Sequence, residues 1–188
     1  EQKEEQNNGV IGIGTDGKPV NMDLWKPTKD GDGWSLMSIM SAYDQEEVYD
    51  GGIDDDGRIV GKIPQYIYSE EEERFMEVTK LSYTFYGCTG LRIAPEIPGS
   101  VKYMDGTFEG CTGLTTAPEI PNSVTSMYWT FSRCTNLTGE ITINANLNSS
   151  EGWYGCFSDT TKPIQLTGTC PILSKLAETS SNGNVTVK

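Results

Sequence analysis

A repeat of 23 residues dominates the sequence between residues 78 and 146. Its three full copies begin at Val78, Val101 and Val124 and read VTKLSYTFYGCTGLRIAPEIPGS, VKYMDGTFEGCTGLTTAPEIPNS and VTSMYWTFSRCTNLTGEITINAN. Each copy keeps an apolar residue, a Thr-Phe pair, a Cys, a Leu and an Ile at matched positions. A fixed period in this range predicts stacked units, each of which is too small to bury its apolar face alone.

Partial copies extend the repeat in both directions. Downstream, Trp-Tyr-Gly-Cys at residues 153–156 keeps the spacing from an aromatic residue to Cys, and residues 164–166 supply a strand. Upstream, the Ile-Pro pair at residues 63–64 matches the two Ile-Pro pairs of the full copies. The chain between this pair and the next Cys is about ten residues too long for one repeat and includes the charge run 69–74. We therefore predict an acidic hairpin inserted near residues 66–78.

The motifs TFYGCTGL, TFEGCTGL, TFSRCTNL, EIPGSV and EIPNSV resemble the leucine-rich repeats of BspA-like surface proteins of anaerobic bacteria. The resemblance covers residues 59–188, with two departures: Thr replaces the Ala before Phe, and Ala-Pro-Glu-Ile-Pro lengthens the strand segment by one residue. It implies a secreted or cell-anchored adhesion module and brings no catalytic residue. From the resemblance we also expect residues 1–8 to be a disordered tail behind a removed leader or a lipid-anchored Cys.

The predicted fold class is a β-rich α/β solenoid, a right-handed leucine-rich-repeat stack with short helical turns and a parallel sheet. Each Thr-Phe-x-x-Cys segment is too short for a long helix and predicts one 3₁₀ or α-helical turn. The segment from Leu to Ile predicts a strand of the sheet. Residues 170–177 predict a short helix with Pro near its first turn, and a last strand follows, so that residues 167–188 form a C-terminal cap.

Residues 9–58 predict a β-rich N-terminal cap region. Apolar residues alternate around Asp16-Gly17, which is a hairpin signal. Residues 26–34 predict a loop, whereas residues 34–43 fit a strand or a short helix, with the strand favoured.

The acidic stretch 44–57 predicts a solvated turn, and its Asp-Asp-Asp-Gly segment leaves a structural calcium ion as an alternative. If Gly57 were the sixth position of a calcium loop, the first and twelfth would be Gly52 and Ile63. Neither is a carboxylate, so we expect no metal.

Charge and composition exclude several classes of function. The formal net charge is −13, and 19 of the 27 acidic residues lie in residues 1–80. An acidic chain without a basic stripe argues against nucleic acid and anionic membrane surfaces, and no apolar run is long enough to predict a membrane span. Histidine is absent, which excludes Cys-His zinc sites and Ser-His catalysis. We expect no cofactor.

Four of the five cysteines share one repeat position: Cys88, Cys111, Cys134 and Cys156. Stacked units would hold neighbouring thiols parallel and about 5 Å apart, whereas a disulfide requires the two Cβ atoms to converge to about 3.8 Å. We therefore predict buried free thiols. A disulfide between Cys156 and Cys170 is the exception that the sequence leaves open.

Period-2 alternation along the predicted strands places one polar residue of each unit on the exposed face of the sheet. This ladder comprises Lys62, Glu96, Glu119, Thr142 and Gln165, with Thr186 as its extension. Glu96 and Glu119 imitate the carboxylate pair of a retaining glycosidase. However, a copied position on an exposed sheet has no pocket to raise one pKa, so we expect no enzymatic activity.

Aromatic residues vary beside the copied Thr-Phe pairs, where the fold does not dictate them. They are Tyr83, Tyr86, Tyr128, Trp129 and Tyr154, and we expect them to gather on one side of the stack. Such residues are candidates for contact with a protein or for stacking on a sugar; packing against the hairpin or a cap is the alternative. The sequence thus predicts a non-enzymatic extracellular or cell-surface interaction and adhesion module that binds a protein or glycan partner. A structural spacer or stalk is the alternative.

Overall fold

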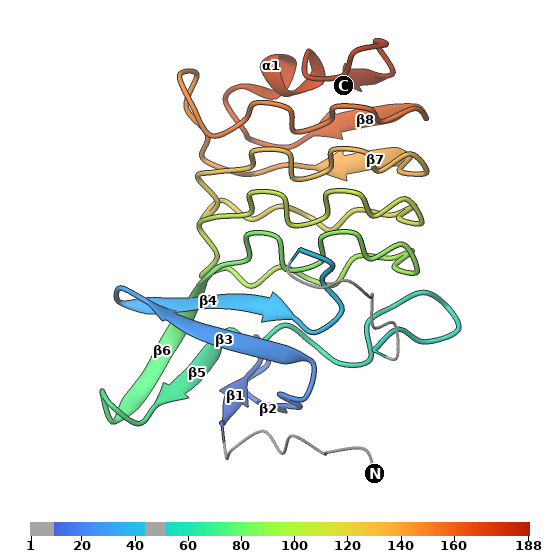
Figure 1. Ribbon diagram of the computed structural model, residues 1–188. Helices are drawn as coiled ribbons and strands as arrows, with labels where there is room; N and C mark the ends of the chain where they lie inside the picture. The colour runs from blue at the N-terminus through green and yellow to red at the C-terminus, as the bar shows by residue number, and fades with distance from the viewer. Residues whose placement is uncertain (1–9, 44–51) are drawn as a thin grey trace.

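The computed structural model describes residues 10–43 and 52–188. The expected tail at residues 1–8 and most of the acidic stretch 44–57 lie outside the described residues. The N-terminal strands form one end of an elongated molecule, and the repeats lie above them in sequence order up to the C-terminus (Figure 1).

A six-stranded sheet of order β2-β1-β5-β6-β4-β3 forms the N-terminal part. Its strands are β1 (Gly12–Ile13), β2 (Pro19–Val20), β3 (Trp25–Asp30), β4 (Gly33–Ser38), β5 (Tyr66–Ser69) and β6 (Arg74–Lys80). All pairings are antiparallel except that of β4 with β6. The acidic turn between β5 and β6 contacts Lys29 of β3, whose ammonium group donates to Glu71 and Glu72 at 3.0 and 2.7 Å.

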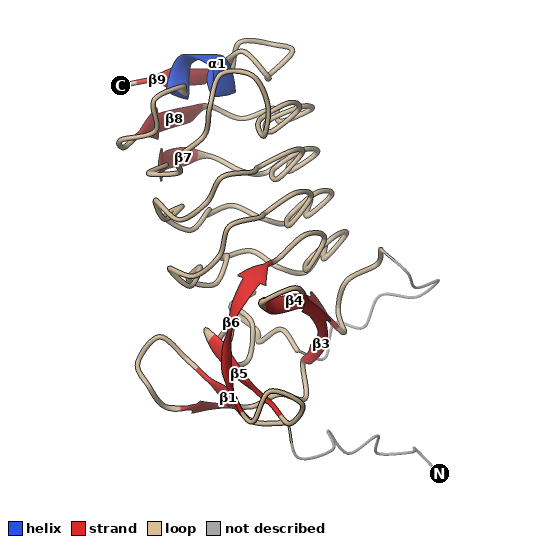
Figure 2. Cartoon of the chain, turned by 90° about the vertical axis from the view of Figure 1, so that its left-hand side faces the viewer, coloured by secondary structure: helices blue, strands red, loops and turns tan. Residues whose placement is uncertain are grey.

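The predicted fold class, an α/β leucine-rich-repeat solenoid with helical turns and one parallel sheet, is wrong. The described residues form two separate sheets and one five-residue helix, α1 (Leu173–Ala177). The second sheet is parallel and has three short strands, β7 (Gly139–Thr142), β8 (Ile164–Thr167) and β9 (Val185–Val187). Between β6 and β7 the chain consists of turns and isolated bridges, which Figure 2 shows as loop.

Two features of the repeat explain this difference. The Thr-Phe-x-x-Cys segments form tight turns, and the residue just before each Cys, such as Gly87 and Gly110 with φ values of 70° and 73°, cannot continue a right-handed helix. The predicted strand segments contain prolines at positions 95, 98, 118 and 121. Because proline has no backbone N–H to donate, these segments form single bridges such as Ile93–Thr116 instead of a continuous ladder.

Successive repeat units lie on one another through their buried side chains. The rings of Phe85, Phe108, Phe131 and Phe157 stack face to face, with centroids 5.5, 5.6 and 5.5 Å apart. All four rings are fully buried. Backbone bonds join the units beside this column; for example, the amide of Phe108 donates to the carbonyl of Thr130 at 3.0 Å.

The fourth unit has a different register from the predicted one. Phe131 and Phe157 are 26 residues apart, compared with 23 between the earlier phenylalanines, because residues 146–152 form a longer loop. The Phe131 amide donates to the carbonyl of Cys156 at 2.9 Å. Cys156 therefore occupies the position of Thr130, and Thr160 that of Cys134. The thiol column contains three cysteines instead of four.

The N-terminal region adds a further unit beneath the first repeat. Leu36 and Met40 are fully buried and four residues apart, like Leu81 and Phe85. Their carbonyls accept from Thr84 Oγ1 at 2.6 Å and from the Cys88 thiol at 3.1 Å, as Leu81 and Phe85 accept from the next unit. Residues 34–43 thus contain a strand followed by a turn that continues the repeat.

Candidate functional site

The residue two positions before each stacked phenylalanine has a positive φ. It is glycine in the second and fourth units, where Gly106 and Gly155 have φ values of 59° and 66°. It is aromatic in the first and third, where Tyr83 and Trp129 have values of 58° and 50°. This conformation strains a non-glycine residue by about 1–2 kcal/mol, and for a bulky residue it is an outlier. The backbone conformation favours glycine at this position, so the fold does not require a tryptophan at residue 129.

Each aromatic ring in this position covers the glycine of the next unit. A Cβ on Gly155 would lie 2.4 Å from Cδ1 and 2.5 Å from Nε1 of Trp129. A Cβ on Gly106 would lie 2.3 Å from Cε1 of Tyr83. The glycines therefore allow the rings to lie directly against the backbone, which fixes the orientation of the indole.

Tyr128, Trp129 and Tyr154 form the aromatic cluster. Tyr154 is 65% exposed and Trp129 39%, and Tyr128 is half-buried. The Trp129 ring lies 6.1 Å from Tyr154 at 88° and 5.7 Å from Tyr128 at 37°. Tyr128 and Tyr154 occupy the same position of successive units, so the cluster spans two units on one side of the molecule.

The other two predicted residues, Tyr83 and Tyr86, pack around Tyr43 from the N-terminal region. The Tyr43 and Tyr83 rings stack at 4.2 Å and 19°, and Tyr86 lies edge-on to Tyr43 at 5.8 Å. Desolvation by burial raises the pKa of the Tyr83 phenol. No ring contact joins this group to the aromatic cluster within the described chain. The five predicted residues thus form two groups. Tyr83 and Tyr86 are half-buried beside Tyr43, which is 49% exposed, whereas Trp129 and Tyr154 of the aromatic cluster are themselves exposed.

Polar groups border the aromatic cluster. Asp105, one unit before Tyr128 at the same repeat position, accepts from the Ser126 hydroxyl at 2.5 Å and the Tyr128 amide at 3.0 Å, both through Oδ1. Burial raises the pKa of the Glu109 carboxyl, and the charge of Arg133 acts in the opposite direction. The Asp105 carboxylate and the Ser126 hydroxyl therefore lie beside the backbone of the cluster at Tyr128.

The predicted polar ladder is interrupted. Ile120 bridges Ile143, which brings Glu119 and Thr142 to neighbouring positions, and Gln165 pairs with Thr186. Thr142, however, pairs with Thr167, because the fourth unit differs in length. Glu119 accepts from Asn144 Nδ2 at 2.8 Å, Lys62 binds Asp16 at 2.8 Å, and the Thr142 hydroxyl lies 3.3 Å from that of Thr167, so these three members of the ladder already have partners.

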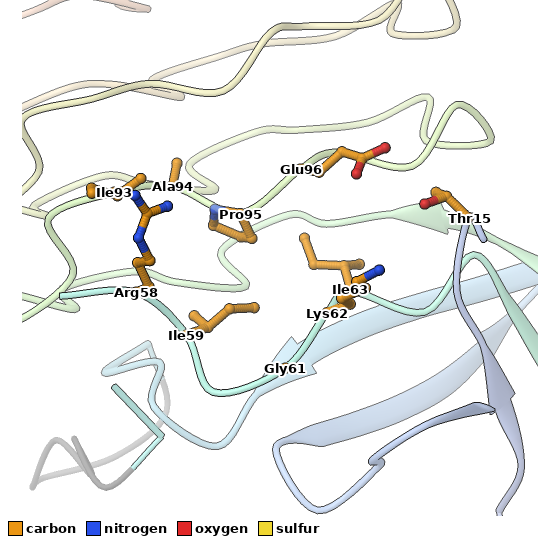
Figure 3. A pocket seen from close by; sticks show the side chains of 10 residues that line it. All are labelled: Thr15, Arg58, Ile59, Gly61, Lys62, Ile63, Ile93, Ala94, Pro95 and Glu96. Carbon is orange, nitrogen blue, oxygen red and sulfur yellow. The ribbon is translucent and has the colours of Figure 1, made fainter. Parts of the chain in front are cut away.

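A cavity of about 240 Å³ lies between the N-terminal region and the first repeat (Figure 3). Lys62 and Glu96 line it together with Arg58 and Thr15, and aliphatic side chains form its floor. The hydrogen bond from Lys62 to Asp16 lowers the pKa of that carboxyl and raises that of Lys62. The lining residues include no nucleophile paired with a general base, so the cavity does not suggest a reaction.

All five cysteines lie among the described residues, and none forms a disulfide. The Cys111 and Cys134 thiols donate to the carbonyls of Phe85 and Phe108 at 3.0 and 3.1 Å. Burial raises the pKa of the Cys88 thiol to about 12, and it also raises the pKa of the Cys111 thiol well above its ordinary value. Low-dielectric surroundings disfavour the thiolate, which is the nucleophilic form. The thiols therefore act as small core residues.

Potential metal ligands do not cluster in residues 10–43 and 52–188. No group of three carboxylate or thiol side chains in these ranges could hold a metal ion. The acidic turn is closed by protein groups: Asp54 Oδ1 accepts from the amides of Asp56 and Arg58 at 3.0 and 2.9 Å. In the same ranges no helix has the length and apolar character required to cross a membrane.

Known proteins offer few parallels to this chain. No protein-family model matches it, and no curated protein matches it. Among solved structures, the chain is similar to a leucine-rich repeat protein from Bacteroides ovatus ATCC 8483, with 16% identity and a TM-score of 0.45. That similarity covers 90% of this chain and 51% of the other, so the chain spans about half the length of that protein. A likeness this weak decides neither family nor function.

The sequence reasoning missed two residues near the predicted aromatic set. Asp105 stands at the repeat position of Tyr128, and alignment of the units could have placed it beside the rings. Tyr43 follows the Leu36-x-x-x-Met40 spacing, which matches Leu81 and Phe85. That signal is weak because only the spacing is kept.

Proposed function

We propose that this chain is a non-enzymatic interaction module at the cell surface or outside the cell, and that it binds a protein or glycan partner through the aromatic cluster. The resemblance of its repeats to BspA-like surface proteins motivates the location, and the absence of histidine supports a role without catalysis. The binding residues are Tyr128, Trp129 and Tyr154. Tyr83 and Tyr86, which pack around Tyr43, support the neighbouring turn.

The observation that carries this proposal is the backbone of Trp129. Its φ of 50° is strained for a bulky residue, whereas two other units have glycine there. Strained backbone is retained where it serves function more often than elsewhere. The indole remains 39% exposed, so burial of the ring does not account for its presence. A structural spacer, the alternative role, would have no use for this side chain.

The repeat itself supplies variants that test the proposal. Each mutation introduces the residue that another unit has at the same position: Trp129→Gly follows Gly106, and Tyr154→Ser follows Ser82. Tyr103→Ser, which follows Ser126, removes an aromatic residue that is 42% exposed outside the cluster and serves as the control.

The four proteins would be applied to an array of host proteins and glycans after their folding is verified by thermal melting. We expect the wild type and Tyr103→Ser to bind the same partner and the two cluster variants to lose it. Equal binding by all four proteins, or no partner for the wild type, would favour the spacer.

A further inference from the structure

We infer that the ligand of the aromatic cluster is a neutral carbohydrate chain, whose sugar rings stack on Trp129 and Tyr154. This inference rests on the proposed function and narrows its partner to one chemical class. It is carried by the size of the cluster, the kind of side chains in it and the charge around it.

The exposed aromatic area is small. An aromatic side chain offers about 150–250 Å², so the exposed fractions of the three rings together leave roughly 300 Å². A stable protein–protein interface buries about 800 Å² on each partner. The cluster by itself is therefore too small to form an ordinary protein interface, but it can accommodate a few sugar rings.

The composition of the surface leads to the same class of ligand. Throughout residues 78–166, all of which the structure describes, the exposed large hydrophobic side chains are Tyr103, Trp129 and Tyr154. No exposed leucine, isoleucine or methionine in that range extends the cluster into a wider apolar patch. One face of a pyranose carries C–H groups that stack on an aromatic ring, and its edge carries hydroxyl groups. Rings beside polar groups match both parts of such a ligand.

The geometry suits stacking. The Trp129 indole lies against Gly155, where even one added Cβ would lie 2.4 Å from the ring, and its exposed part faces outward. Tyr154 stands at 88° to it and borders the indole. Asp105, on the preceding unit, accepts from the Ser126 hydroxyl and the Tyr128 amide, so its carboxylate is oriented before a ligand binds. A fixed platform with a fixed acceptor loses little entropy on binding.

Charge selects a neutral chain. Asp105 and Glu109 lie on the unit before the cluster, Arg133 lies on its first unit, and Asp159 lies on its second unit, so acidic groups outnumber basic ones around the rings. An anionic polysaccharide would be repelled over the range of the Debye length, about 10 Å at 0.1 M salt. Neutral glycans carry no such penalty.

The experiment is affinity electrophoresis in gels that contain one soluble polysaccharide each: a β-glucan, a xylan, a galactomannan, an α-glucan, or heparin as the anionic control. Isothermal titration with oligosaccharides of any retarding polymer then gives Kd. The proteins are the wild type, Trp129→Gly, Tyr154→Ser and Tyr103→Ser, all verified as folded by thermal melting.

We expect at least one neutral polymer to retard the wild type and Tyr103→Ser equally, and heparin to retard neither. Trp129→Gly should weaken the affinity by roughly tenfold or more, the scale of one stacked ring. Ligand should also change the fluorescence of Trp129 in the wild type.

Three results would overturn the inference: no retardation by any neutral polymer, equal retardation of all four proteins, or equal losses in Trp129→Gly and Tyr103→Ser. If the array instead finds a protein that requires Trp129, the carbohydrate inference fails while the proposed function stands. If Trp129→Gly binds as the wild type does in the array and in the gels, both the proposed function and the carbohydrate inference fail.

Discussion

The indole of Trp129 lies directly over Gly155 of the next repeat unit, so close that a methyl group on Gly155 would lie 2.4 Å from Trp129 Cδ1. Tyr83 and Gly106 have the same relationship one pair of units earlier. At this repeat position, where the backbone has a positive φ in each unit of the phenylalanine stack, aromatic residues and glycines thus alternate from one unit to the next. The alternation lets a large ring lie flat on the surface of a narrow stack.

This relationship predicts an energetic coupling between the two residues. Gly155→Ala should destabilise the wild type by roughly 2–4 kcal/mol, because overpacking against the indole adds to the strain of a positive φ. In a Trp129→Gly background only the strain remains, so the loss should fall to about 1–2 kcal/mol. Urea unfolding of the four proteins in a double-mutant cycle measures the difference.

Gly139→Ala provides the control for this cycle. Gly139 has a φ of 88°, but a Cβ there would meet nothing within 4 Å. Its substitution should cause the same loss with and without Trp129. A Gly155→Ala loss that also does not depend on Trp129 would show that the two residues are not in contact.

The stacked phenylalanines predict a strong dependence of stability on Phe108. Phe108 is fully buried, with Phe85 at 5.5 Å on one side and Phe131 at 5.6 Å on the other. Phe108→Ala should lower the free energy of unfolding by about 3–5 kcal/mol, through lost burial and the remaining cavity. A change of less than about 1 kcal/mol in urea unfolding would be inconsistent with a buried column.

The buried thiols predict a loss of stability at alkaline pH. A free thiol titrates near pH 8.5, whereas burial raises the folded pKa of Cys88 to about 12. Between these values the unfolded chain releases a proton that the folded chain keeps. The contribution of the thiols to the free energy of unfolding should therefore be constant below about pH 8 and fall above it, by up to about 1.4 kcal/mol per pH unit for each thiol.

Unfolding of Cys88→Ala and Cys111→Ala across pH 7–11 supplies the comparison, since each variant should show a shallower decline than the wild type. The same argument predicts five titratable thiols in denaturant without reductant and slow reaction in the native state. Three thiols in denaturant would reveal a disulfide that the structure does not contain.

Chelation should leave the melting temperature unchanged. The amides of Asp56 and Arg58 bind Asp54 Oδ1, so the acidic turn is closed without an ion. Calorimetric melting with EDTA and then with added calcium tests this. A fall of several degrees that calcium reverses would place a cation in the turn.

The buried positions of the repeat could be predicted from the sequence, because spacing alone identifies them. Leu91, Leu114 and Leu137 are all fully buried, as the matched positions required. The secondary structure could not be predicted in this way. The repeat pattern predicted strands and helical turns. However, the prolines lack the backbone N–H groups that a strand ladder needs, and residues of positive φ prevent the turns from continuing as helix.

The position of the last unit shows a second limit. The match of Cys156 to Cys134 is preferred from the sequence because its spacing is closest to the 23-residue repeat. In the structure, the longer loop before Gly155 shifts the unit so that Phe157 continues the phenylalanine stack. Burial of a Phe ring stabilises more than burial of a thiol, and the register follows the larger side chain. Residues 26–34 predict a loop, but Trp25–Asp30 form strand β3. The local sequence does not reveal this strand, because it is stabilised by pairing with β4.

The separation of binding from stability at Trp129 is the sharpest test of the binding role proposed for this residue. The measurement is the affinity of Trp129→Gly for the partner that the wild type retains, taken together with its free energy of unfolding in urea. We predict an affinity loss of at least about tenfold and a stability within about 1 kcal/mol of the wild type, because relief of backbone strain offsets the lost contact with Gly155. Unchanged affinity, or a loss of several kcal/mol in stability, would show that Trp129 serves the fold instead.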